Sequence, residues 1–151
     1  MLVKNLFEKE AHDEILHRIH YLTPVSYGHW GKMNVAQMLV HCQEAFKIPL
    51  SSKPHKLTLF GFLIGWAMRK KLYDDQPWDK NLPTAPNFRI HGEYKFESER
   101  DKLVSMINSF YEKGTAGIGD KIHPVFGKFT AEQWGKSMWK HLDHHLRQFG
   151  V

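Results

Sequence analysis

Trp139-Lys-His-Leu-Asp-His-His-Leu-Arg-Gln-Phe149 is the segment that indicates both a helix and a chemistry. Its residues His141 and His145 are four apart, which places two side chains about 40° apart around an α-helix and about one turn apart along it. His145 belongs to an apolar stripe formed with Trp134, Met138, Leu142 and Phe149, with His141 at its edge. Such a stripe faces a core, and two inward imidazoles at this spacing can share one metal ion.

The third histidine of the segment, His144, falls on the side of the helix that carries Ser137 and Lys140. We therefore predict that it is solvated and takes no part in the site. A single inward histidine is usually a core residue bonded to a neighbour, but an inward pair at i,i+4 favours a metal.

Composition predicts an ordinary globular chain. Its 151 residues indicate one domain, 1–151, and 42% of them are hydrophobic. The formal charge is +5, but the basic residues are scattered, so we expect no nucleic-acid partner. Eleven histidines favour metal binding, whereas the single cysteine, Cys42, excludes an internal disulfide and a zinc ribbon of paired cysteines.

The first ten residues lack the apolar stretch of a signal peptide. The longest apolar stretch, 57–68, is about 12 residues long, against about 20 for a membrane span. We therefore expect a cytoplasmic protein with no membrane partner.

Helical periodicity predicts helices over 5–21, 34–47, 58–73 and 98–112, and a last helix that begins after Thr130. Asn34 is a predicted N-cap, and Thr130 with Gln133 forms a predicted capping box. Strand signals are nearly absent apart from a short candidate at 94–96. The fold class is therefore all-α, a four-helix bundle with an additional short helix and long connecting loops.

The middle of the chain consists of an apolar segment, 58–73, and an irregular segment, 74–96. The strongly apolar helix 58–73 ends in Arg69-Lys70-Lys71, which we interpret as a core helix with cations at its C-terminus, where the helix dipole favours them. A membrane-surface or dimer helix is the less favoured alternative. The irregular segment 74–96 contains three prolines and is long enough to cover a functional site.

A catalytic metal site of the zinc type takes three protein ligands, so a facing helix must supply a third. His41 is the best candidate, because it lies mid-helix beside the apolar face of the 34–47 helix. The competitors in the first helix, His12, His17 and His20, lie off its apolar register. Histidines in loops could line the mouth of a site, and these are His29, His55, His91 and His123.

These histidines carry a resemblance to the DinB-like (damage-inducible protein) superfamily, and most closely to an uncharacterised branch of it. The terminal helix of that superfamily has the pattern His-x-x-x-His-x-x-Gln, which His141, His145 and Gln148 match. Its second helix carries a histidine after a Trp and a short turn, as Trp30 to His41 do here. This chain has Leu146-Arg147 where the family often has Arg-Gly.

The resemblance implies an up-down-down-up four-helix bundle that holds a divalent metal, zinc or nickel, through His41, His141 and His145. Dimers are frequent in the family, so a homodimer is among the expected partners. Characterised relatives include thiol-dependent S-transferases and an isomerase, and others are described as hydrolases. The implied partner is therefore a small-molecule substrate, together with a low-molecular-weight thiol.

Three neutral imidazoles leave a 2+ charge uncompensated, which lowers the pKa of a bound water toward about 7 or activates a thiolate. Hydrolysis also needs a general base, but the helical wheel turns both Glu44 and Asp143 outward. The sequence therefore favours thiol activation or hydrolysis without a base. Cys42 points about 100° away from His41 around the helix, and we predict that it is a small buried hydrophobic residue and not a nucleophile.

Gln148 is a candidate outer partner that orients an imidazole, with an exposed glutamine as the equal alternative. Trp66, Trp78, Trp134 and Trp139 are expected to fill the core or the pocket wall.

Two functions follow from these observations. The first is a metal-dependent enzyme of the transferase, isomerase or hydrolase type, with a pocket between the second and last helices. The second is a non-enzymatic, stress-associated binding protein in which the metal is structural or absent.

Overall fold

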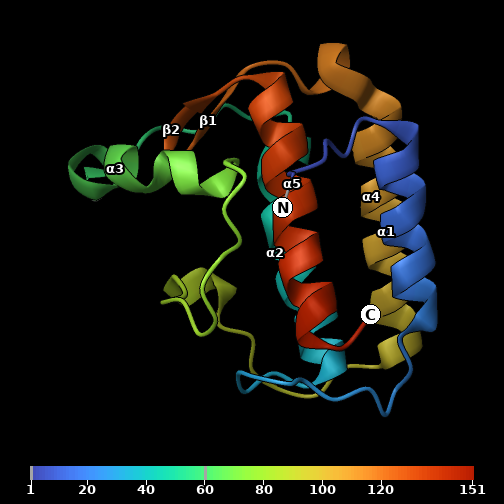
Figure 1. Ribbon diagram of the computed structural model, residues 1–151. Coiled ribbons are helices and arrows are strands. Elements are labelled where there is room, and N and C mark those ends of the chain that lie inside the picture. The colour runs from blue at the N-terminus through green and yellow to red at the C-terminus, as the bar shows by residue number, and fades with distance from the viewer. Residues whose placement is uncertain (1, 60) are drawn as a thin grey trace.

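Four long helices form the bundle in the computed structural model, which describes residues 2–59 and 61–151, without the side chains of Ile64 and Trp66. They are α1 (Lys9–Tyr21), α2 (Val35–Leu50), α4 (Phe96–Ile118) and α5 (Ala131–Gln148). In Figure 1, α1 and α5 run in one direction, and α2 and α4 run in the other. The structure is thus the all-α bundle that the sequence predicts, and the helix order is up-down-down-up.

The two parallel helices α2 and α4 pack extensively against each other. A parallel pair needs a connection that returns along the bundle, and residues 51–95 provide it (Figure 1). The connection contains only short helices: η1 (Gly61–Gly65), α3 (Trp66–Arg69), η2 (Lys70–Leu72) and η3 (Pro86–Phe88). Its second half contacts α2 through η3, and the Phe88 carbonyl there lies against His41.

Both predicted helix starts on the site helices are confirmed. The Asn34 side chain accepts a hydrogen bond from the Gln37 backbone N–H, and the Gln37 side chain accepts one from the Asn34 N–H. Thr130 and Gln133 form the same reciprocal capping box at the start of α5. These caps satisfy backbone donors that the first helical turn leaves unpaired, and so they fix the residue at which each helix begins.

Helix α5 is the central element of the bundle. Twelve of its 18 residues are buried, including Ser137 and Lys140. The prediction that the side of this helix with Ser137 and Lys140 is solvated was therefore wrong. Lys140 is only 1% exposed, and its ammonium donates to the carbonyls of Lys71 and Asp74 and to the Asp74 carboxylate. The return segment thus covers a helix face whose residue types are those of a surface.

The predicted helix 58–73 and its core location are wrong in the described residues. The chain there forms the short elements η1, α3 and η2, and Leu59, Phe62 and Leu63 are 63–77% exposed. Phe60 lies outside the described residues. Glycine spacing is the reason: Gly61 and Gly65 are buried against the backbone of Pro124 and Val125, which turns the neighbouring apolar side chains outward.

Two smaller predictions also differ from the structure. Phe96 begins α4, so the candidate strand at 94–96 is absent. Where the sequence gives no clear strand signal, the structure has an antiparallel hairpin of β1 (Lys121–His123) and β2 (Gly127–Phe129). In the described part of the chain, no helix has the length and apolarity needed to cross a membrane.

Candidate metal centre

His41 from α2 and His141 and His145 from α5 come together inside the bundle, as predicted. One nitrogen from each ring lies within 4.8 Å of the others, and the His41 and His141 Nε2 atoms are 3.0 Å apart. The ring centroids are separated by 4.5–5.0 Å. All three residues are buried, with 6–8% of their surface exposed. Three imidazole nitrogens this close together supply the ligand types of a zinc-type site.

His41 is held by a backbone carbonyl from the return segment. Its Nδ1–H donates to the Phe88 carbonyl oxygen at 2.9 Å, and the Phe88 ring packs against the imidazole edge. Because Nδ1 carries the proton, the Nε2 atom of His41 has its lone pair directed at the cluster. The cover predicted for segment 74–96 therefore contributes directly to the orientation of a candidate ligand.

His145 is oriented by Gln148, the predicted outer partner. The Gln148 Nε2 donates to the Trp30 carbonyl at 2.6 Å, which fixes the amide so that its Oε1 accepts from His145 Nδ1 at 2.8 Å. Nε2 of His145 is therefore also the unprotonated nitrogen. Gln148 is 3% exposed, so the exposed-glutamine alternative is wrong. Outer partners of this kind set the tautomer and direction of metal-binding histidines.

The turn before α2 leaves room for that amide. Gly31 has φ +78°, and a Cβ there would lie 2.6 Å from the Gln148 Nε2. Trp30 and Gly31 both help to position the Gln148 amide. Trp30 does so by accepting a hydrogen bond with its carbonyl, and Gly31 does so because it has no side chain that would occupy the same space.

His141 has a different environment. Its Nδ1 is buried with no hydrogen-bond partner among the described residues, and Trp78 packs against the ring at 5.7 Å between centroids. Two unprotonated Nε2 atoms 3.0 Å apart would repel each other. Either the Nε2–H of His141 donates to His41 or a cation lies between the two lone pairs. The donor set thus fits a metal.

All three imidazoles are neutral at pH 7 in this environment. Burial lowers the pKa of His41, and burial with the neighbouring histidines holds the pKa of His141 well below its usual range. The same two causes lower the pKa of His145 to about 3. Neutral imidazole is the form that binds metals, so the burial of the cluster keeps all three histidines in their metal-binding protonation state.

The competing histidines lie elsewhere. His12 is buried, but it contacts Asn108 and Asp13 and stacks on Tyr111 of α4. His17 and His20 contact Tyr21 on the outside of α1. Of the loop histidines, His123 accepts backbone hydrogen bonds in the hairpin turn. In the described residues the three-histidine group is the one cluster of metal-binding type.

The acidic neighbours are engaged away from the histidines, as the helical wheel predicts. Glu44 pairs with Lys47. Asp143 also faces away from the cluster, but it is buried, because it accepts from Arg18 at 2.8 Å and from Arg147 at 2.9 Å. Cys42 is 1% exposed and burial raises the pKa of its thiol, in agreement with its predicted role as a small hydrophobe.

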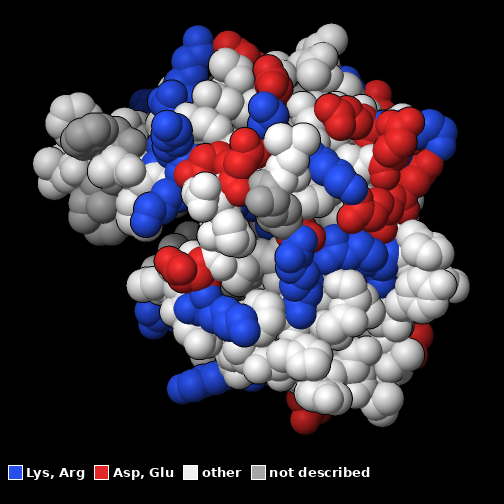
Figure 2. All heavy atoms as spheres, viewed as in Figure 1, with Lys and Arg blue, Asp and Glu red and all other residues white. Residues whose placement is uncertain are grey.

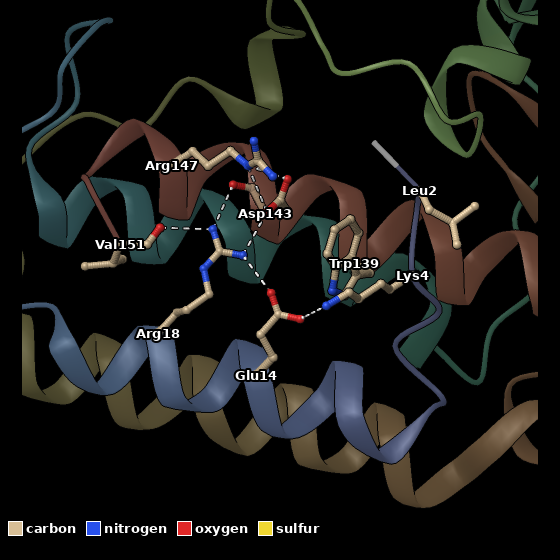
Figure 3. Close-up of a pocket in the computed structure, with 8 residues that line it drawn as sticks. All are labelled: Leu2, Lys4, Glu14, Arg18, Trp139, Asp143, Arg147 and Val151. Carbon is tan, nitrogen blue, oxygen red and sulfur yellow. Dashed lines mark hydrogen bonds and ion pairs between the residues drawn. The ribbon is translucent and has the colours of Figure 1, made fainter.

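A cavity of about 370 Å³ lies on the α1 side of α5 and not at the histidines. Figure 3 shows that its charged residues point toward one another: Arg18 reaches Asp143 and the Val151 carbonyl, and Lys4 reaches Glu14. Because these charges already pair with each other, we regard the cavity as structural.

A second cavity, about 190 Å³, lies beside the histidine cluster. Trp30 and Trp78 line it, and both contact the ring of His144. Lys80 also lines it, with its ammonium over the Trp30 ring. His144 is half-buried here, contrary to the predicted solvated position. Neither cavity is lined by α2, so the predicted pocket between α2 and α5 is not one of them.

The predicted roles of the tryptophans are confirmed for three of the four. Trp134 and Trp139 are core residues at 2% exposure, and Trp78 forms the cavity wall. The side chain of Trp66 lies outside the described part of the structure. Sequence reasoning could not find the Phe88 and Trp30 carbonyls, because backbone groups leave no residue-type signal.

Comparisons with known proteins place the chain in one family. No curated protein and no solved structure matches it. Residues 4–150 match a family described as "Protein of unknown function (DUF1569)". Since the match covers nearly the whole chain, the protein belongs to the DUF1569 family.

Proposed function

We propose that this protein binds one divalent metal ion, zinc or nickel, through His41, His141 and His145, and that DUF1569 is a branch of the DinB-like superfamily. The observation that carries the proposal is the shared tautomer of two ligands. Hydrogen bonds from Nδ1 of His41 to Phe88 and from Nδ1 of His145 to Gln148 leave both Nε2 lone pairs for a metal. The helix order and the His-x-x-x-His-x-x-Gln pattern support the link to the superfamily.

The proposed activity is that of an enzyme acting on a small molecule, of the thiol-dependent S-transferase or isomerase type or of the hydrolase type. A metal held by three neutral imidazoles supplies a 2+ charge that acidifies a bound water or stabilises a thiolate. In the described residues no carboxylate joins the cluster as a general base. This supports the thiol-dependent types over hydrolysis, which gains most from such a base.

The protein's own residues define how a small molecule would approach. The cavity of about 190 Å³ adjoins Trp78, which packs on His141, so Trp78 separates the cavity from the cluster. The cavity is smaller than the pockets of about 300–1,000 Å³ that hold drug-sized ligands, so it suits only a very small molecule, for which its tryptophans provide flat apolar contacts. Lys80 supplies a positive charge at its edge.

The decisive experiment measures metal content by inductively coupled plasma mass spectrometry on tag-free protein. We expect about one zinc or nickel per chain in the wild type and none in His145→Ala. His144→Ala is the matched control, because His144 is the next residue on the same helix and half-buried. Full metal loading of His145→Ala, or no metal in the wild type after soaking with both ions, would refute the proposal.

The burial of the cluster favours a second candidate, in which the metal only stabilises the bundle of a non-enzymatic, stress-associated protein. His41, His141 and His145 are each at most 8% exposed, and Trp78 and Phe88 pack against them. A structural ion predicts that chelation unfolds the chain at 25 °C. An enzyme's ion predicts a folded apo-protein that recovers thiol-dependent activity when the ion is returned.

A further inference from the structure

An apolar arm, formed by residues 57–72 with η1, α3 and η2, projects sideways from the bundle (Figure 1). Several large apolar side chains among its described residues are exposed. Leu59, Phe62 and Leu63 are 77%, 68% and 63% exposed, and Met68 is 44% exposed. Exposed apolar residues that stand singly are ordinary, but a cluster of this size on a projection marks an interaction surface.

The arm is fixed in this position at both ends. At its start, Thr58 donates from its backbone N–H and from its hydroxyl to the Pro124 carbonyl. Gly61 and Gly65 sit against the hairpin turn so closely that a Cβ at Gly65 would lie 1.7 Å from the Val125 carbonyl oxygen. At its end, the Lys71 carbonyl accepts from Trp78 Nε1 and from the Lys140 ammonium. The exposure is therefore a property of the fold.

The arm and the chain that leads into it carry only positive charge, and Asp74 and Asp75 follow the arm closely. From residue 45 to residue 73 the chain has six Lys or Arg residues and no Asp or Glu. Lys53, Lys56, Lys70 and Lys71 are exposed, and none of them forms a salt bridge with a described residue. Figure 2 shows the projecting lobe without charged side chains on the visible face of its described part, and Lys and Arg gather where the lobe meets the body.

We propose that the apolar arm docks the protein onto an anionic lipid surface. Apolar side chains at the tip would enter the boundary between headgroups and acyl chains, while lysines nearer the bundle would stay at the depth of the phosphates. This arrangement of an apolar face next to basic residues is that of interfacial helices. The proposal replaces our expectation from the sequence that no membrane is a partner, and it does not depend on the metal.

A second copy of the chain fits the arm less well. Two arms packed against each other would bring their exposed lysines together, and like charges at a close contact are unfavourable. An anionic lipid surface instead satisfies the apolar and the basic parts at the same time. The second copy is therefore an outcome that the experiment must detect, rather than the occupant that the charges favour.

The test is sedimentation of the full chain with vesicles of phosphatidylcholine, with and without about one-third phosphatidylglycerol. We expect the wild type to sediment with the anionic vesicles, to bind the neutral ones weakly, and to be released by salt. Phe62→Ser/Leu63→Ser should reduce the partition coefficient at least tenfold. Lys70→Gln/Lys71→Gln should reduce it about fivefold for each lysine.

Two controls match these variants. Val25→Ser/Tyr27→Ser removes two exposed apolar side chains from the loop between α1 and α2, and Lys32→Gln/Lys113→Gln removes two exposed lysines outside the arm. Neither should change the partition coefficient more than twofold. Circular dichroism should show all four variants folded, since the substituted side chains are exposed.

Three results would overturn the proposal. The first is absence of the wild type from the anionic pellet, and the second is equal loss of binding in arm and control variants. The third is a dimer of the wild type, measured by light scattering without vesicles, that Phe62→Ser/Leu63→Ser converts to a monomer. That result would assign the arm to contact between copies.

Discussion

Replacing Gln148 with leucine tests the orientation of the candidate ligands through a residue that need not touch the metal. The substitution keeps the volume but removes two buried hydrogen bonds, one to His145 Nδ1 and one to the Trp30 carbonyl. Each lost bond leaves a buried partner unsatisfied, at about 1–3 kcal/mol for each. Since Gln148 is 3% exposed, water cannot replace it, and we expect a loss of about 3 kcal/mol in the free energy of unfolding.

The effect on metal binding should exceed any general destabilisation. Without its acceptor, His145 is free to rotate and to exchange tautomers, which should weaken metal affinity about 10–100-fold. The assay is competition for zinc with a chromophoric chelator, alongside urea denaturation of the metal-free protein. A shift of about 6–12 °C in Tm should accompany the variant.

Gln43→Leu provides the matched control. Gln43 is also a buried glutamine with two hydrogen bonds, both donated to Glu99 on α4. Its loss should cost a similar free energy of unfolding but leave zinc affinity within about twofold, because it supports no histidine. Equal zinc affinity in Gln148→Leu and wild type would refute the reasoning, and so would an equal loss in both variants.

Three further predictions concern His123, Cys42 and Arg18. Burial lowers the pKa of His123 to about 4, and its Nδ1 accepts two backbone N–H groups, so the unfolded chain binds the proton first as the pH falls. The stability it contributes is complete above the unfolded pKa of about 6.5 and is lost toward pH 4, which amounts to about 2 kcal/mol by pH 5 in urea melts. His123→Asn keeps an acceptor but does not titrate. Between pH 8 and pH 5 its free energy of unfolding should therefore fall by about 2 kcal/mol less than that of the wild type. Burial and a raised pKa should keep Cys42 unreactive toward an aromatic disulfide reagent at pH 8 until urea unfolds the chain, so rapid labelling of the native protein would contradict its core position. Arg18→Met should cost about 3 kcal/mol, because it removes the main partner of the buried Asp143 carboxylate, while metal content measured by mass spectrometry stays at the wild-type level.

The parts of the fold that were predictable have signals within one or two helical turns. The Asn34 and Thr130 capping residues mark helix starts locally, and the i,i+4 spacing of His141 and His145 determines that they share a face. His41 could be selected because its own helix has a clear apolar side. These inferences depend only on residues of a single helix and do not require knowing which helices pack against each other.

The remaining parts depend on contacts between distant segments. Lys140 looks like a surface residue, but carbonyls about 70 positions away in the chain bury it. The 58–73 stretch looks like a core helix by its composition, yet Gly61 and Gly65 matter more, because they allow close contact with a hairpin turn. Nothing in the local sequence indicates that this turn lies beside them.

The parallel arrangement of α2 and α4 has a consequence for how this protein can vary. The return from the end of α2 to the start of α4 has to cover about 24 Å, the length of a 16-residue helix. About eight extended residues would suffice for this distance, yet residues 51–95 are used. The surplus forms the arm and the cover over the histidines. Substitutions and insertions in this surplus can alter what reaches the cluster while the helices that supply its ligands keep their packing. The exceptions are positions such as Phe88 and Asp74, whose contacts with His41 and Lys140 tie the return segment to the helices.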